Sequence, residues 1–197
     1  MARRDDVATQ AWAVLLGAYL LGSIPTAHLV ARFFAGVDIR MIGDGNAGAK
    51  NTFESLGFQP GLVVLITDLG KGAVAVLVAR QFELPEHIPY WAGACAVLGH
   101  DYPLFMRFRG GQGMAAMTGV FFALYPVQSA IGLLIFALAL TLTRHWDLSC
   151  TFGFAALPLL LWYSASPALD VLYPVLMLPT IGLRKIVAVR RARRVIA

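Results

Sequence analysis

Charged residues are scarce in this sequence of 197 residues. Asp, Glu, Lys and Arg together make up only 14% of the chain, whereas hydrophobic residues make up 58%. Soluble domains carry about 25% charged residues, so a chain this apolar cannot cover a surface that faces water. The deficit excludes a soluble enzyme, a disordered regulator and a fibrous protein. It predicts an integral membrane protein.

The sequence is also poor in the patterns that build metal centres, disulfides and β-barrels. Its two cysteines, Cys95 and Cys150, lie in apolar runs, where we expect buried hydrophobic side chains rather than a disulfide or a metal pair. The apolar runs are long and do not alternate with polar residues, which argues against an outer-membrane barrel. The chain contains no H-E-x-x-H, no G-x-S-x-G and no His-x4-Asp pattern. We therefore predict no bound metal, no cofactor and no serine nucleophile.

What the sequence does contain is seven apolar segments suited to crossing a bilayer, which takes about 20 residues, or fewer in a tilted or hinged helix. Pro25 is expected to kink the first segment, and Pro126 divides a stretch that is too long for one span into two short helices. The segments are Ala11–Phe34, Gly61–Ala79, Pro89–Met106, the two halves of Met114–Thr143, Cys150–Ser164 and Pro167–Leu183. We predict an all-α membrane protein with one transmembrane domain over residues 1–197 and its spans within residues 10–183.

Positive charge is concentrated outside these segments. The tail at residues 184–197 contains six Lys or Arg residues and no acidic residue, and short basic segments of membrane proteins remain in the cytoplasm. Seven spans place the basic loops 36–60 and 107–113 on that same side, whereas six spans would divide them between the two faces. We therefore predict a multi-pass protein with a cytoplasmic C-terminus. The net charge of +5 indicates anionic membrane lipids as partners and no nucleic acid.

The loop at residues 36–60 has the composition of an anion-binding site. Gly43, Gly45 and Gly48 allow backbone N–H groups to turn toward one point, and a helix beginning near Lys50 adds the positive end of its dipole. Cationic and amide side chains stand among these glycines, namely Arg40, Lys50, Asn46 and Asn51. The alternative is a flexible linker at the membrane surface, but linkers rarely concentrate such residues around glycines. We predict that this loop binds phosphate.

Two ionisable residues interrupt the second apolar segment. Asp68 and Lys71 are three positions apart, so they share a helix face and can pair. A charge at the centre of a membrane helix costs about 2.5–3.5 kcal/mol, which makes such residues functional candidates by default. The alternative, which the sequence leaves open, is a structural ion pair that holds the bundle together.

A histidine and a second glycine-rich loop follow the third segment. His100 can hydrogen-bond a phosphate or act as a general base, although a histidine at a helix end is often only a cap. Glycines before a helix form either an anion site or a tight turn. The loop 107–113 contains Gly110, Gly111, Gln112 and Gly113. Because both glycine-rich loops are predicted on one membrane face, we expect them to face one polar pocket.

Taken together, these motifs resemble those of the PlsY family, the bacterial integral-membrane acyl-phosphate:glycerol-3-phosphate acyltransferases. The resemblance is strongest from Leu21 to Gly119, where the pieces occur in the family's order and spacing. The matching pieces are Leu21-Gly22-Ser23-Ile24-Pro25, Val37-Asp38-Ile39-Arg40, Gly43-x-Gly45-Asn46-x-Gly48-Ala49-x-Asn51, Asp68-x-x-Lys71-Gly72, Gly99-His100-x-x-Pro103 and Phe108-x-Gly110-Gly111-x-Gly113. Single pieces would be weak, but the ordered set between spans is specific.

The resemblance implies a seven-helix bundle in the bacterial inner membrane with an active site open to the cytoplasm. It implies transfer of a fatty acyl group from an acyl phosphate to the 1-hydroxyl of glycerol 3-phosphate, without a metal or a covalent enzyme intermediate. Such a reaction requires positioning, and positive or N–H groups around two phosphates. As catalytic residues we predict Asn46, Asp68, Lys71 and His100. As substrate-binding residues we predict Arg40, Gly43, Gly45, Gly48, Lys50, Asn51, Gly110, Gly111, Gln112 and Gly113.

Four positions depart from the family pattern. The chain has Asp44 where the family usually has Ser, Lys50 for Thr, Glu54 for Arg and Gln112 for Lys. A carboxylate about 4 Å from a phosphate costs roughly 4 kcal/mol at an effective dielectric of about 20, and Lys50 alone acts in the opposite direction. One interpretation is an acyltransferase with a rearranged site. The other is a catalytically degenerate relative, acting as a subunit of a larger membrane complex or as a lipid-binding scaffold. We adopt the enzyme; a transporter has less support, because the halves show no repeat.

Overall fold

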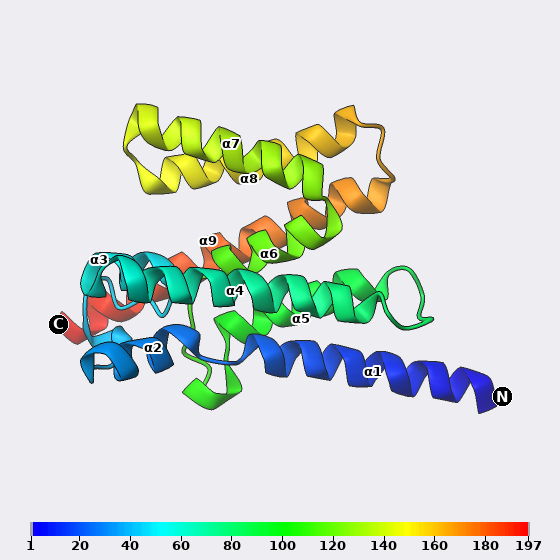
Figure 1. Cartoon of the computed structure of the whole chain (residues 1–197), viewed down its shortest axis with the longest axis horizontal. Coiled ribbons are helices and arrows are strands. Elements are labelled where there is room, and N and C mark those ends of the chain that lie inside the picture. The colour runs from blue at the N-terminus through cyan, green and yellow to red at the C-terminus, as the bar shows by residue number, and fades with distance from the viewer. Residues whose placement is uncertain (1, 197) are drawn as a thin grey trace. The chain divides into compact units, whose positions relative to one another are not determined.

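The structure, a computed structural model, describes the backbone of residues 2–196 and the side chains of residues 6–183. Every regular element in the described backbone is a helix (Figure 1). Helices satisfy their own backbone hydrogen bonds, as the interior of a bilayer requires, and the predicted all-α membrane architecture is confirmed. Within the described residues, three stretches are long and apolar enough to cross a membrane. They are Asp6–Ala35, Phe58–Ala79 and Pro126–Thr143; Met114–Leu124 and Ala168–Leu183 are shorter apolar helices.

The chain forms two compact units, which are described separately. Met1–Val120 with Thr180–Ala197 makes up unit 1, and Phe121–Pro179 makes up unit 2. The single transmembrane domain expected from the sequence stays a prediction. The predicted basic tail at 184–197 lies beyond the residues whose side chains are described.

Unit 1 begins with a hinged pair of helices, α1 (Ala2–Gly22) and α2 (Thr26–Ala35). Pro25 has no backbone N–H to donate, and its backbone angles (φ −86°, ψ 68°) are not helical. The kink predicted near Pro25 is therefore confirmed as a complete break between the two helices. The break frees backbone groups that take part in the site described below.

The segment predicted as one loop, residues 36–60, is partly helical, so its predicted extent is wrong. It contains the short 3₁₀ helix η1 (Ile39–Met41), the helix α3 (Ala49–Leu56) and the start of α4 (Phe58–Ala79). The start of α3 agrees with the helix expected near Lys50. Gly57, at φ 92°, makes the turn between α3 and α4 in a conformation that strains other residues.

The helix α5 (Ile88–Asp101) packs beside α1 and α4. It is shorter than the predicted span Pro89–Met106. Pro103 disfavours a helical conformation for the residue before it, and the 3₁₀ helix η2 (Leu104–Met106) replaces the expected last turn. The third span therefore ends one turn earlier, and its polar end faces the second glycine-rich loop.

Glycines bring the helices of unit 1 into backbone contact. A Cβ added at Gly99 of α5 would lie 2.9 Å from the backbone nitrogen of Ser23, after α1. A Cβ added at Gly72 of α4 would lie 2.9 Å from a backbone carbon of Ala116, in α6 (Met114–Leu124). Real Cβ atoms do not approach so closely, so α1 with α5 and α4 with α6 pack at distances that only glycine permits.

Unit 2 is a helical hairpin of α7 (Pro126–Thr143) and α8 (Trp146–Tyr163), which run side by side in Figure 1, with the first part of α9 (Ala168–Ile196). The division at Pro126 is confirmed. The start expected at Cys150 is wrong, because α8 begins four residues earlier at Trp146. The phenol of Tyr125 donates to Asp170 at 3.2 Å within this unit.

Candidate active site

A buried carboxylate organises the polar centre of unit 1. Asp68, on α4, is fully buried, and its Oδ1 accepts a hydrogen bond from the Thr26 hydroxyl and an ion-pair contact of 2.9 Å from Lys71 Nζ. His100 Nδ1, at the end of α5, lies 3.6 Å from the same oxygen. Because a buried charge is tolerated only when it is paired, these partners offset the cost of burying the Asp68 carboxylate in an apolar bundle.

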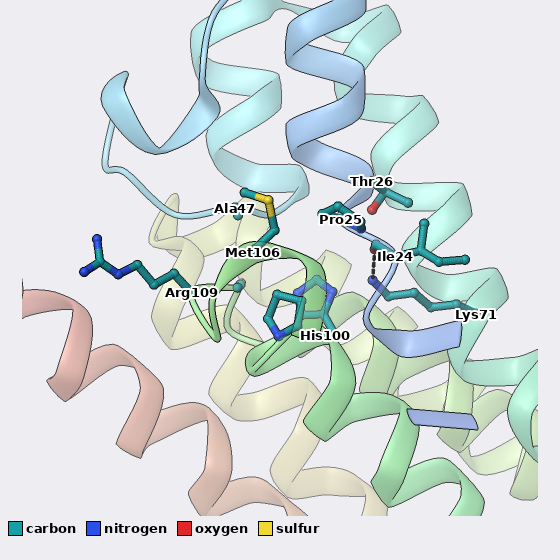
Figure 2. A pocket seen from close by; sticks show the side chains of 11 residues that line it. Ile24, Pro25, Thr26, Ala47, Lys71, His100, Met106 and Arg109 are labelled. Atoms are coloured by element: carbon teal, nitrogen blue, oxygen red, sulfur yellow. Dashed lines mark hydrogen bonds between the residues drawn. The ribbon is translucent and has the colours of Figure 1, made fainter. Parts of the chain in front are cut away.

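Lys71 connects this network to the break between α1 and α2. Its ammonium also donates to the carbonyl oxygen of Ile24 at 3.3 Å, shown as the dashed line in Figure 2. That carbonyl lies in the break that Pro25 creates. The pairing of Asp68 with Lys71 that the sequence indicated is present, and it extends to the hinge.

A small pocket that is partly open to solvent lies against this network. It is lined by the hinge, by one residue of the first glycine-rich loop, by α4, by the end of α5 and by the second glycine-rich loop (Figure 2). The lining residues are Ile24, Pro25, Thr26, Ala47, Lys71, His100, Pro103, Met106, Arg109, Gly110 and Gly111. The structure thus brings the two glycine-rich loops together at one pocket, as the sequence predicted.

The second glycine-rich loop lies directly against α5 because its glycines have no Cβ. The amides of Gly110 and Gly111 donate to the carbonyl oxygens of Asp101 and His100, each at 3.2 Å. A Cβ at Gly111 would lie 2.8 Å from Ala47 O and would also collide with the His100 ring. These two glycines line the pocket, but their amides face the end of α5 rather than a bound anion.

Asn51 stabilises the first glycine-rich loop from inside. Its side-chain amide donates to the carbonyl oxygens of Ile39, Ile42 and Asn46 at 3.0–3.1 Å, and its oxygen accepts from the Asp44 amide. Asn51 is fully buried, and its hydrogen bonds to the backbone hold the loop in shape. The phosphate-binding role expected for Asn51 stays a prediction.

Arg40 also acts within the loop. Its guanidinium pairs with Asp38 at 2.6 Å, and Asp38 Oδ1 lies 3.3 Å from His28 Nδ1. The Arg40 guanidinium holds the pKa of the Asp38 carboxyl well below its usual range, and Asp38 raises the pKa of Arg40 in return. Of the two roles predicted for Arg40, loop support or anion contact, the structure favours support.

The departures from the family pattern in the first loop form a cluster of their own. Lys50 Nζ lies 3.2 Å from Glu54 and 3.8 Å from Asp44, and all three side chains are partly or largely exposed. None of them lines the pocket, so the two carboxylates do not fill it.

The remaining predicted residues do not line the pocket. Asn46 accepts from Asn51 through its carbonyl, and its side chain lies over Gly48, 3.1 Å from where a Cβ would be. Gly43 and Gly45 have positive φ angles and form the turn of the first loop. Gln112 follows Gly111 without lining the pocket, and Gly113 faces the carboxylate of Asp101. Substrate contacts by these residues stay predictions.

Two polar residues of the lining, Thr26 and Arg109, were not among the site residues predicted from the sequence. For Thr26 a signal was present, because a hydroxyl beside a proline break in a span favours a polar contact. Within the described residues, no group of three His, Cys, Asp or Glu side chains could hold a metal ion.

The helical fold and its apolar spans define an integral membrane protein, and a pocket with a buried polar floor lies close to those spans. Comparison with known proteins specifies this class further. Residues 12–195 match the family model described as glycerol-3-phosphate acyltransferase. The chain belongs to this family of membrane acyltransferases, and the resemblance found in the sequence is confirmed.

Individual relatives agree with this assignment. The chain is 44% identical over 147 residues to the glycerol-3-phosphate acyltransferase of Geotalea daltonii, covering 75% of each protein. It is 38% identical over 146 residues to that of Desulforamulus reducens, covering 74% of this chain and 73% of the relative. The crystal structure of PlsY (YgiH) in its glycerol 3-phosphate form is similar, with a TM-score of 0.84 and 30% identity over 94% of this chain and 92% of that one. Its lysophosphatidic acid form gives a TM-score of 0.82.

Proposed function

We propose that this protein transfers a fatty acyl group from an acyl phosphate to the 1-hydroxyl of glycerol 3-phosphate, giving lysophosphatidic acid and inorganic phosphate. The observation that carries the proposal is the pocket at which both glycine-rich loops meet above buried Lys71 and His100. The family, and a similar structure in a glycerol 3-phosphate form, supply the substrate class.

The chemistry requires little of the protein beyond positioning, because an acyl phosphate is a reactive mixed anhydride. The hydroxyl oxygen forms a bond to the acyl carbon, the bond from that carbon to the phosphate oxygen breaks, and the hydroxyl proton leaves with the phosphate. No nucleophilic side chain is needed. The ring of His100 is oriented by Asp68, whose Oδ1 lies 3.6 Å from His100 Nδ1, which places its other nitrogen to hydrogen-bond a substrate oxygen. Lys71 supplies positive charge at the floor of the pocket.

The alternative, a catalytically degenerate scaffold or complex subunit, rested on Asp44, Glu54 and Gln112. The carboxylates of Asp44 and Glu54 pair with Lys50 and do not line the pocket, so they do not repel a phosphate bound there at close range. The case for a degenerate protein is therefore weaker. We further propose that the protein resides in the bacterial inner membrane with its pocket and C-terminus on the cytoplasmic side. The basic loops and tail support this orientation.

The test is the purified protein in detergent, supplied with palmitoyl phosphate and glycerol 3-phosphate and assayed for released phosphate and lysophosphatidic acid. His100→Ala should lower kcat/KM by about 10- to 100-fold, as expected for loss of a hydrogen bond to a charged group. His87→Ala is the matched control, because His87 is exposed and remote from the pocket lining, and it should be unaffected.

Absence of turnover in the folded wild-type protein would contradict the acyltransferase and favour the scaffold. Recovery of activity in Asp44→Ser with Gln112→Lys would then identify the two departures as the cause.

A further inference from the structure

The pocket offers little uncommitted positive charge to the substrates proposed for it. Glycerol 3-phosphate and an acyl phosphate are both anions, and they repel each other unless positive groups lie nearby. Lys71 is already paired with Asp68, and the amides of Gly110 and Gly111 donate to carbonyls of α5. A further cation is therefore needed at the pocket.

Arg109 meets this need. It lines the pocket, it is exposed, and its guanidinium makes no ion pair or hydrogen bond with the side chains and backbone that the structure describes. Figure 2 shows its side chain extending away from His100, with the guanidinium directed outward. An exposed arginine changes rotamer within nanoseconds, so this group can turn onto an anion in the pocket mouth.

The backbone before Arg109 is arranged for this placement. Arg107 and Phe108 both have positive φ angles, 52° and 59°, which residues other than glycine seldom adopt. The Arg109 amide then donates to Met106 O at 3.2 Å. This strained turn brings residue 109 to the pocket and leaves Arg107, two positions earlier, outside the lining.

We propose that Arg109 binds a substrate phosphate at the mouth of the pocket, an inference that rests on the proposed function. A guanidinium offers a planar pair of N–H groups that matches two phosphate oxygens. Gln112, the other long polar side chain after Arg109 in this loop, carries no charge, so Arg109 is the loop's source of positive charge at the lining.

A phosphate oxyanion also occurs on anionic lipids, which a cation at the membrane surface can attract. A comparison of Arg107 with Arg109 distinguishes substrate phosphate from lipid phosphate. Both are exposed basic residues of the same loop, but only Arg109 lines the pocket. A lipid-headgroup role would be shared by both and would vanish in a nonionic detergent without lipid. A substrate role belongs to Arg109 alone and persists there.

The experiment measures KM for glycerol 3-phosphate and for palmitoyl phosphate in nonionic detergent, together with calorimetric binding of glycerol 3-phosphate. Arg109→Gln should raise KM, and weaken binding, by about 10- to 100-fold for at least one substrate, while Arg109→Lys retains part of the affinity. Arg107→Gln should match wild type. Adding Gln112→Lys to Arg109→Gln should restore part of the lost affinity, because it returns a cation to the same loop.

Equal KM values for Arg109→Gln and Arg107→Gln would overturn the inference. A loss that appears only when anionic lipid is added would assign Arg109 to headgroups and also overturn it. If the wild-type protein bound glycerol 3-phosphate in an Arg109-dependent way without turnover, the proposed function would fail and this inference would stand.

Discussion

Lys71 is the residue whose removal tests the buried network most directly. Lys71→Ala removes the closest cation from the fully buried Asp68 carboxylate, so the free energy of unfolding should fall by about 3–5 kcal/mol. Thermal unfolding in detergent measures the loss. Lys50→Ala removes a partly exposed pair and should cost no more than about 1 kcal/mol. Equal melting temperatures for the two variants would contradict the pairing described.

Asp38, at the base of the first glycine-rich loop, makes a pH-dependent contribution to the stability of the folded protein. Its pKa is lower in the folded protein than the usual value of about 3.9, so its stabilisation is present at neutral pH and is lost as the pH falls below about 4. Asp38→Asn should therefore destabilise the protein by about 1 kcal/mol near neutral pH, and the difference should shrink on acidification. Melting temperatures across this range check it, with exposed Glu83→Gln as the control. A difference that grows on acidification would refute the assignment.

At the scale of single residues, the sequence predicted which side chains are functional candidates better than it predicted which groups those side chains contact. The spacing of Asp68 and Lys71 was enough to predict their pair, because residues three apart on a helix are neighbours. Nothing local predicts that His100 and Thr26 share the same carboxylate, since those contacts join distant segments. Asn51 was assigned to phosphate because its type suits an anion. The structure shows that its carbonyl partners lie 5 to 12 positions away in the folded loop.

At the scale of elements, the second glycine-rich loop leaves no space for an added side chain at Gly111. Gly111→Ala places a methyl group against Ala47 O and the His100 ring, so the loop must move away from α5. We expect kcat/KM to fall at least about 10-fold, because the displaced loop moves His100 and the pocket wall out of position. Gly70→Ala, which meets nothing within 4 Å in α4, should be neutral or stabilising. Similar activity of the two variants would contradict the tight contact.

The helix breaks at Pro25 and Pro126 were predicted from the sequence, whereas the break before Pro103 and the elements beside the glycines were not. Pro25 and Pro126 end helices for a local reason, the missing N–H, and both breaks are present. The start of α3 was expected near Lys50, but its extent was not predicted, because its residues are mostly polar and its neighbours are glycines, which signal a loop. The turn at Arg107 and Phe108 had no local signal at all, because its positive φ angles occur in residues that normally avoid them.

At the scale of the whole molecule, the meeting of the two glycine-rich loops constrains the topology. Since Gly111 lies against Ala47, both loops have to be on one face of the membrane, with the connector at residues 80–87 on the other. In a variant without native cysteines, a cysteine at Met41 or Arg107 should react with an impermeant thiol reagent only from the cytoplasmic side. A cysteine at Glu83 should react only from the outside. Labelling of Met41 and Glu83 from the same side would contradict the arrangement.

The glycine contacts at Gly99 and Gly72 also limit where a lipid can lie. Along these two seams the backbones of α1 and α5, and of α4 and α6, touch, leaving no width for a hydrocarbon tail. A tail whose headgroup sits near His100 therefore cannot thread between either pair. Its route into the surrounding leaflet has to lie outside these two seams.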